Sequence, residues 1–130
     1  MSARLAVGLL LILAVSAQAE GPTAEEKADL AAKLLTFQQQ LSEWQPAPAA
    51  RDAEADVAVC AKAVEWLLRH DEFYKPADLA TAHKVLETGA GRLALAKEGK
   101  FPWRSEPGSH VLGYRSKIDK SVQPFAVTFP

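Results

Sequence analysis

The chain has three histidines, the residue type used most often as a metal ligand or as a general base near neutral pH. His70, His83 and His110 lie 13 and 27 residues apart, and none has a second histidine four positions away. That spacing would be needed to place two imidazoles on one helix face. His70 precedes Asp71 and Glu72, but neighbours in a helix sequence point in different directions. We therefore interpret His70 as part of a solvated helix end and His83 as a core residue, and predict no metal site.

Nucleophilic chemistry has no candidate either. No serine stands in a Gly-x-Ser-x-Gly motif, whose strained turn presents the nucleophile of serine hydrolases. Gly89-Ala90-Gly91 lacks the Lys-Ser/Thr that completes a phosphate-binding loop. We predict no catalytic residue and no cofactor site in this chain.

One cysteine and two tryptophans are the remaining candidates. Cys60 is the only cysteine, so it cannot form an internal disulfide, and its apolar neighbours favour a small core residue. Trp66 and Trp103 could form an aromatic floor for a sugar or a peptide. Burial of apolar area, with one hydrogen bond from the ring nitrogen, is the interpretation that we favour.

The first nineteen residues have the pattern of a cleavable signal peptide. Arg4 precedes an unbroken apolar run over residues 5–15, and Ala17-Gln18-Ala19 is a small-x-small cleavage site. Cleavage is expected before Glu20. The apolar run is shorter than the roughly 20 residues of a membrane-spanning helix. We therefore expect an exported protein, periplasmic or secreted, without a permanent membrane anchor.

The overall charge excludes two classes of partner. The formal net charge of the chain is −1, from 15 Lys and Arg against 16 Asp and Glu. Nucleic-acid binding selects for a clustered basic surface, and binding to anionic lipid selects for basic clusters as well. We expect neither partner.

Residues 20–100 are predicted to form about three amphipathic helices. Thr23 and Glu26 form a capping box that begins the first helix, and prolines 46 and 48 end it. The second helix should begin within residues 52–56, where carboxylates favour the positive end of the helix dipole, and run to about His70. Pro76 fits the first turn of the third helix, and Gly99 its end. The expected buried stripes contain Leu30, Leu34, Phe37, Leu41 and Trp44, then Val57, Ala61, Val64 and Leu68, then Leu79, His83, Leu86, Ala90 and Leu93.

Residues 101–130 are predicted to form a loop and a β-hairpin. Leu112, Tyr114, Ser116 and Ile118 alternate with Val111, Gly113, Arg115 and Lys117, which predicts a first strand, and residues 122–129 predict a second. The turn is expected at Asp119 and Lys120. An isolated two-stranded hairpin is marginal in water, so we expect either packing on the helices or an incomplete β domain. The predicted fold class is mainly α, with a signal peptide (1–19), a helical segment (20–100) and this hairpin (101–130).

Several segments between residues 56 and 130 share a recognisable pattern. They are the run from Asp56-Val57 to Glu65-Trp66-Leu67-Leu68, then Glu72-Phe73-Tyr74-Lys75-Pro76, Gly113-Tyr114-Arg115-Ser116-Lys117-Ile118-Asp119 and Ser121-Val122-Gln123-Pro124-Phe125. These segments resemble the N-terminal region of exported bacterial serine hydrolases with an α/β-hydrolase fold, of the prolyl oligopeptidase-like or esterase type. The resemblance covers roughly residues 56–130. Lys120 departs from the pattern, because a turn glycine is expected there.

The resemblance implies a non-catalytic N-terminal segment, because the nucleophile, acid and histidine of that family lie beyond the residues matched here. We expect either the leading part of a longer hydrolase or the product of a truncated reading frame. The expected partner is the remainder of the hydrolase, its β and catalytic domains. A self-contained small periplasmic helical binding or adaptor module is the alternative.

Overall fold

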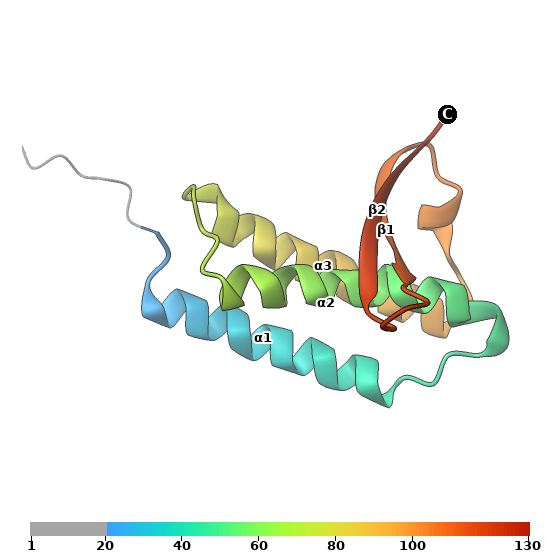
Figure 1. Cartoon of the computed structure of the whole chain (residues 1–130), viewed down its shortest axis with the longest axis horizontal. Coiled ribbons are helices and arrows are strands. Elements are labelled where there is room, and N and C mark those ends of the chain that lie inside the picture. The colour runs from blue at the N-terminus through green and yellow to red at the C-terminus, as the bar shows by residue number, and fades with distance from the viewer. Residues whose placement is uncertain (1–20) are drawn as a thin grey trace, which may run out of the picture.

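Three helices followed by an antiparallel hairpin make up the computed structural model, which describes residues 21–130 (Figure 1). This confirms the predicted fold class, mainly α with a C-terminal hairpin. The predicted signal peptide and its cleavage residues Ala17, Ala19 and Glu20 lie outside the described residues. Within the described part of the chain, no helix is both long enough and apolar enough to span a membrane. The elements are α1 (Ala24–Glu43), α2 (Arg51–Arg69), α3 (Ala77–Lys97), β1 (Gly108–Arg115) and β2 (Val122–Phe129).

Helix α1 begins at the predicted capping box. The Thr23 hydroxyl accepts a hydrogen bond from the Glu26 amide at 3.1 Å, and the Glu26 carboxylate accepts one from the Thr23 amide at 2.8 Å. Of the predicted stripe, Leu30, Leu34 and Phe37 are buried, whereas Leu41 and Trp44 are partly exposed. The helix therefore packs most closely through its middle.

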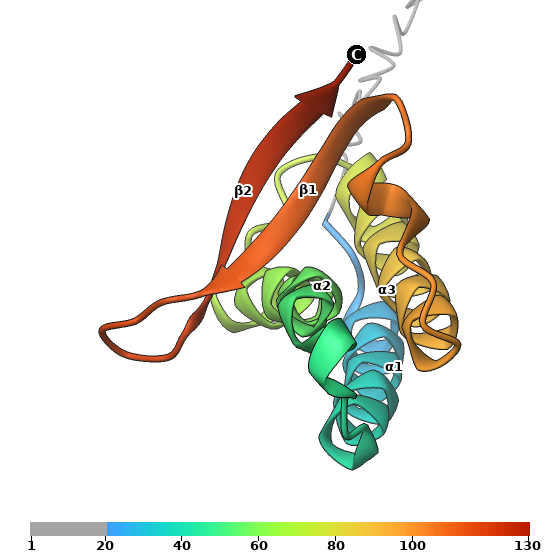
Figure 2. The same ribbon diagram turned by 90° about the vertical axis from the view of Figure 1, so that its right-hand side faces the viewer.

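Helix α2 is the central helix and begins slightly earlier than predicted. A short 3-10 turn over Pro48–Ala50 leads directly into Arg51. Its predicted stripe is confirmed at Val57, Ala61 and Val64. The buried surface is wider than a single stripe because α1, α3 and the hairpin all contact this helix. Figure 2 shows the hairpin on the side of α2 that faces away from α1.

Helix α3 is rotated relative to the predicted stripe. Its buried residues are Ala82, Leu86, Gly89, Leu93 and Ala96, whereas Ala90 is exposed. Small residues occupy the contact because α3 lies close to its neighbours. A Cβ atom at Gly89 would lie 2.7 Å from the Phe37 ring and 2.8 Å from the Cys60 Cβ. Gly89 therefore marks the close helix contact that we considered for it.

The hairpin begins and turns earlier than predicted. Strand β1 ends at Arg115, so Ser116 and Ile118 lie in the connection rather than in the strand, and Ile118 is 97% exposed. A six-residue connection tolerates exposed side chains without strand pairing. Lys120 takes the left-handed conformation, with φ at +61°, where a glycine would be unstrained. Strand β2 has the predicted bounds.

The hairpin shares one hydrophobic core with the helices. Leu112 of β1, Val122 of β2 and Trp103 of the preceding loop are buried in the same cluster as residues of α1, α2 and α3. Trp103 lies in a short 3-10 turn over Pro102–Arg104. Figure 2 shows β1 nearer to the helices and β2 on the outer side of the hairpin. This asymmetry determines which strand edge is free.

Candidate functional site

A buried carboxylate lies at the junction of α2 and the hairpin. Asp56 is 0% exposed, and it is the one buried charged residue within segment 21–130. Its Oδ2 accepts hydrogen bonds from Trp103 Nε1 at 3.0 Å and from Arg104 Nε at 2.7 Å. Its Oδ1 accepts one from the Gly113 amide at 3.0 Å. A buried charge is tolerated when it is paired and hydrogen-bonded in this way.

Two arginines complete the junction. Arg104, which pairs with the Asp56 carboxylate, also donates to the Asp52 carbonyl at 2.7 Å. Arg92 of α3 donates to the Asp56 carbonyl and to the Val111 carbonyl, both at 2.9 Å. Helix α2, helix α3 and strand β1 are thereby joined through a single cluster of side chains.

Gly113 allows β1 to touch the backbone of α2. A Cβ at this position would lie 2.1 Å from the Ala55 carbonyl oxygen, which no side chain could tolerate. Arg115 of β1 fixes the strand further, since its Nε donates to the Glu54 carboxylate at 2.8 Å. This hydrogen bond raises the pKa of Arg115. Gly113 and Arg115 thus attach the hairpin to α2.

The hydrogen-bonding pattern of the hairpin follows from one residue pair. Gly113 is opposite Pro124, which has no amide hydrogen, and the Gly113 amide donates to Asp56 instead of to β2. The backbones of Gly113 and Pro124 therefore form no hydrogen bonds with each other. Such pairs alternate along antiparallel strands, so the pairs Val111–Ala126 and Ser109–Thr128 are of the same class.

The two edges of the hairpin differ as a result. On β1, the outward Val111 carbonyl and Gly113 amide are bound by Arg92 and Asp56. On β2, only the outward Val122 carbonyl is bound by a side chain, that of Lys62. Ala126 and Thr128 are exposed and direct their amide and carbonyl groups away from β1. The helices thus bind two outward groups of the β1 edge. No side chain of residues 21–130 binds the outward groups of Ala126 and Thr128, and we call this part of β2 the open edge.

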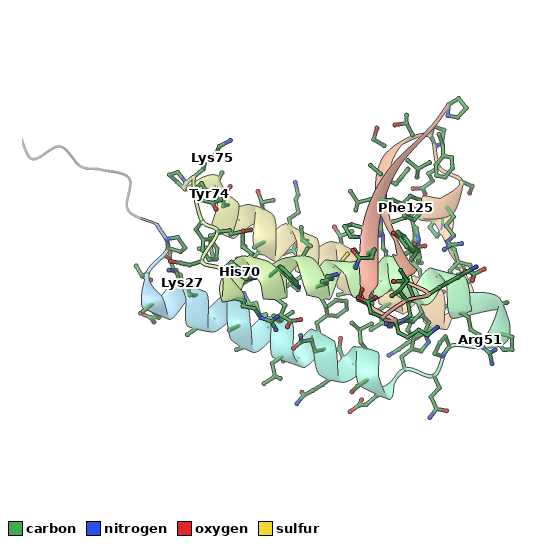
Figure 3. The ribbon with its side chains drawn as sticks, viewed as in Figure 1. Lys27, Arg51, His70, Tyr74, Lys75 and Phe125 are labelled. Atoms are coloured by element: carbon green, nitrogen blue, oxygen red, sulfur yellow. The ribbon has the colours of Figure 1, made fainter. Side chains whose placement is uncertain are left out.

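An aromatic surface lies beside the open edge. Tyr114 and Phe125 are 52% and 42% exposed, and their ring centroids are 6.1 Å apart. His110 and Phe129 form a second pair on the same hairpin face, 5.8 Å apart. Figure 3 shows Phe125 on the outer strand. Strand β2 also carries no charged residue, so it lacks the charges that commonly protect exposed edges.

The opposite face of the hairpin forms one wall of a groove. Helices α2 and α3 form its floor, with Trp66 and Val85 exposed or half-buried along it, and Val111 and Pro124 lie on the wall. The groove has a volume of about 800 Å³. Most of the surface that it presents is apolar.

The three histidines do not come together. His70 is exposed at the end of α2, far from the hairpin that carries His110 (Figure 3). His83 is only half-buried, with Nε2 4.0 Å from the Asp29 carboxylate, so it lies at the edge of the core rather than within it. No cluster of His, Cys, Asp and Glu within residues 21–130 could hold a metal ion.

Cys60 and Trp103 are core residues, as we favoured. Burial raises the pKa of the Cys60 thiol, and the nearby positive charge of Arg92 opposes this only in part. A protonated buried thiol is a poor nucleophile. Trp103 is buried and donates to Asp56, so it cannot form an open aromatic floor with Trp66. For Trp66 the favoured burial is wrong, because its side chain is 47% exposed.

The role of Asp56 as the centre of the junction was not predicted from the sequence. We assigned its carboxylate to the helix N-terminus, but it lies beyond the first turn of α2. Cys60 and Val64 follow it at spacings of four and eight residues, and both are buried. That periodicity places Asp56 on the buried face and was the available signal.

Comparison with known proteins gives no relative: no family model, no curated protein and no solved structure matches the chain.

Proposed function

We propose that the chain is a non-catalytic module of an exported serine hydrolase of the esterase or prolyl oligopeptidase-like type. Its hairpin docks on the β domain of that hydrolase, through the open edge of β2. The observation that carries this proposal is the difference between the two hairpin edges. The helices bind the Val111 carbonyl and the Gly113 amide on the β1 edge, whereas Ala126 and Thr128 offer their backbone groups outward.

The sites of the resembling residues support a structural role. Asp56, Gly113 and Arg115 belong to segments that resemble the hydrolase N-terminal region, and all three hold the hairpin against α2. None of them lies in a cluster of a nucleophile and a base. A module of this kind contributes a rigid strand, not chemistry.

Strand addition is the mode of docking that this edge favours. An extended strand pairs with exposed backbone groups, and pockets for alternate side chains give specificity. The adjacent Tyr114–Phe125 pair would cover the apolar side chains of an incoming strand. Pro124 offers only its carbonyl, so the added strand should pair with residues 125–129.

Activity assays test the non-catalytic part of the proposal. The purified chain should hydrolyse neither p-nitrophenyl acetate nor Gly-Pro-p-nitroanilide above the buffer rate. Hydrolysis that co-purifies with the protein over successive columns, and that a serine-directed phosphonate abolishes, would contradict the proposal.

Sequencing of the DNA that follows the codon for Pro130 and of the neighbouring genes adds a second test, because we expect a Gly-x-Ser-x-Gly hydrolase there.

Docking is tested by a substitution at the open edge. Ala126→Pro removes one outward amide at a position without mutual hydrogen bonds, where proline is tolerated as it is at position 124. We expect it to weaken binding to that hydrolase domain by about tenfold, the loss of one hydrogen bond in a poorly hydrated strand pair. Ala126→Thr keeps the amide and serves as the control. Equal affinities of the two variants would exclude docking through this edge.

A self-contained periplasmic binding or adaptor module remains the second proposal. The groove beside Trp66 favours it, because an exposed apolar concavity of this size suits a ligand. Such a module would keep its full ligand affinity without any hydrolase. Ligand affinity that depends on an added hydrolase domain would contradict this second proposal.

A further inference from the structure

We propose that the groove between the hairpin and helices α2 and α3 binds a small amphipathic anion. The apolar body of the ligand lies along Trp66 and Val111, and its anionic group lies beside Lys62. Arg92 adds positive charge at the other end of the groove. The groove volume of about 800 Å³ falls within the range of small-molecule sites. This inference does not depend on the docking of the hairpin, which uses the edge of β2.

The apolar part of the site is exposed, and no helix or strand of residues 21–130 covers it. Trp66 is 47% exposed and Val111 is 54% exposed, although both are large apolar side chains. They come from different elements, α2 and β1, and Pro124 of β2 extends the same wall. A flat apolar ligand would contact the floor and the wall together, and its burial would remove apolar surface from water on both sides.

The charges of the site decide which class of ligand it accepts. Lys62 donates to the Val122 carbonyl, and Arg92 donates to the Asp56 and Val111 carbonyls. Neither cation forms an ion pair with a carboxylate of residues 21–130. No acidic residue of this segment lines the groove.

Backbone carbonyls orient these two cations but do not neutralise them. The positive charges are therefore held in place before any ligand arrives, which lowers the entropic cost of binding an anion. A neutral ligand would displace water from the cations without supplying a counter-charge, and such desolvation is costly. An amphipathic anion covers the apolar walls and pairs with Lys62, while the charge of Arg92 adds to the positive potential of the groove.

The experiment uses two aromatic probes of equal shape. Naphthalene-2-carboxylate and naphthalene-2-carboxamide are titrated into the ¹⁵N-labelled 130-residue chain, and the Trp66 indole and Val111 amide signals are followed. We expect the carboxylate to bind at least about tenfold more tightly than the amide, since a hydrogen bond to a charged group exceeds a neutral one by this factor. Its affinity should fall as sodium chloride is added. Equal affinities, or binding of an uncharged strand peptide but not of the carboxylate, would overturn the proposal.

Variants locate the charge recognition. Lys62→Gln should weaken carboxylate binding by about tenfold, whereas Lys84→Gln, the same change at an exposed position of α3 outside the groove, should leave it unchanged. Val111→Glu places an acid at an exposed position of the wall and should abolish binding of the carboxylate. This variant tests the site even if Lys62→Gln disturbs the packing of β2. Unchanged binding in Val111→Glu would overturn the proposal.

Discussion

Asp56 shows how one residue can organise a small protein. Its carboxylate accepts hydrogen bonds from a loop indole, a loop guanidinium and a strand amide, and these donors lie 47, 48 and 57 residues away along the chain. Water could replace none of these three donors unless a cavity opened for it, because the carboxylate is fully buried. Removal of the carboxylate would leave all three donors unpaired.

Asp56→Ala should lower the free energy of unfolding by about 3–5 kcal/mol, the usual cost of breaking a buried ion pair. Asp56→Asn keeps the shape and one acceptor oxygen, so its cost should be about 1–3 kcal/mol. Urea unfolding followed by circular dichroism measures both. Asp29→Ala, at an exposed residue of α1, is the control and should stay within about 0.5 kcal/mol. If Asp56→Ala lowered the free energy of unfolding by less than Asp29→Ala does, the role of Asp56 as the centre of the junction would be contradicted.

Cys60 should be unreactive in the native protein. Burial raises the pKa of its thiol above the ordinary value of 9.0, so alkylation by iodoacetamide at pH 8 should be slower in the native protein than in urea. As the pH rises, the thiol ionises in the unfolded state before it does so in the native state. Its contribution to the free energy of unfolding is therefore present below the ordinary pKa and is lost as the pH passes the native-state pKa. Mass spectrometry of timed samples measures the rate. Equal rates in both states would show that the thiol is accessible.

At the scale of elements, glycines determine how closely the helices and the hairpin approach. Gly89 of α3 faces Phe37 and Cys60, and Gly113 of β1 faces the backbone of α2. Gly91, two residues after Gly89, faces open space, with nothing within 4 Å of a Cβ placed there. The same residue type therefore has opposite consequences on two faces of one helix.

Substitution of the two glycines by alanine should have opposite effects. Gly89→Ala forces a Cβ against Phe37 and Cys60, and overpacking of this kind costs about 1–3 kcal/mol, which exceeds the gain in helix propensity. Gly91→Ala meets no atom and should stabilise α3 by about 0.5–1 kcal/mol. Midpoints of thermal unfolding compare the two variants. Shifts of the same sign would contradict the assigned contact.

At the scale of the whole molecule, the helices and the hairpin are parts of one core. Leu112 and Val122 of the hairpin are buried in the same cluster as Leu30 of α1 and Leu86 of α3. A two-stranded hairpin has little stability of its own. It persists here because its inner strand is fixed by Asp56, Arg92 and Arg115.

Unfolding should therefore be a single cooperative transition. In increasing urea, the Trp103 indole proton, which is hydrogen-bonded to Asp56, should lose its native signal at the same midpoint as the helical circular dichroism. NMR and circular dichroism on one sample series measure the two midpoints. An earlier loss of the Trp103 signal would show that the hairpin detaches before the helices melt.

The number and order of the elements could be predicted from the sequence, because their signals are local. The capping box of Thr23 and Glu26, the stop at Gly99 and the bounds of β2 depend on residues within a few positions of each other. The predicted buried face of α3 was partly wrong, since a stripe through Leu79 and Ala90 fits the sequence almost as well as the observed buried face. Small residues carry little hydropathy signal.

The tertiary structure alone decided the candidate site. Asp56 has the same local sequence whether it caps a helix dipole or binds Trp103 and Gly113, and only the arrival of partners some 50 residues away distinguishes these roles. The open edge of β2 and the groove beside Trp66 likewise exist only once the hairpin stands on α2. Contacts between distant residues depend on how the elements pack, and local sequence patterns do not contain that information.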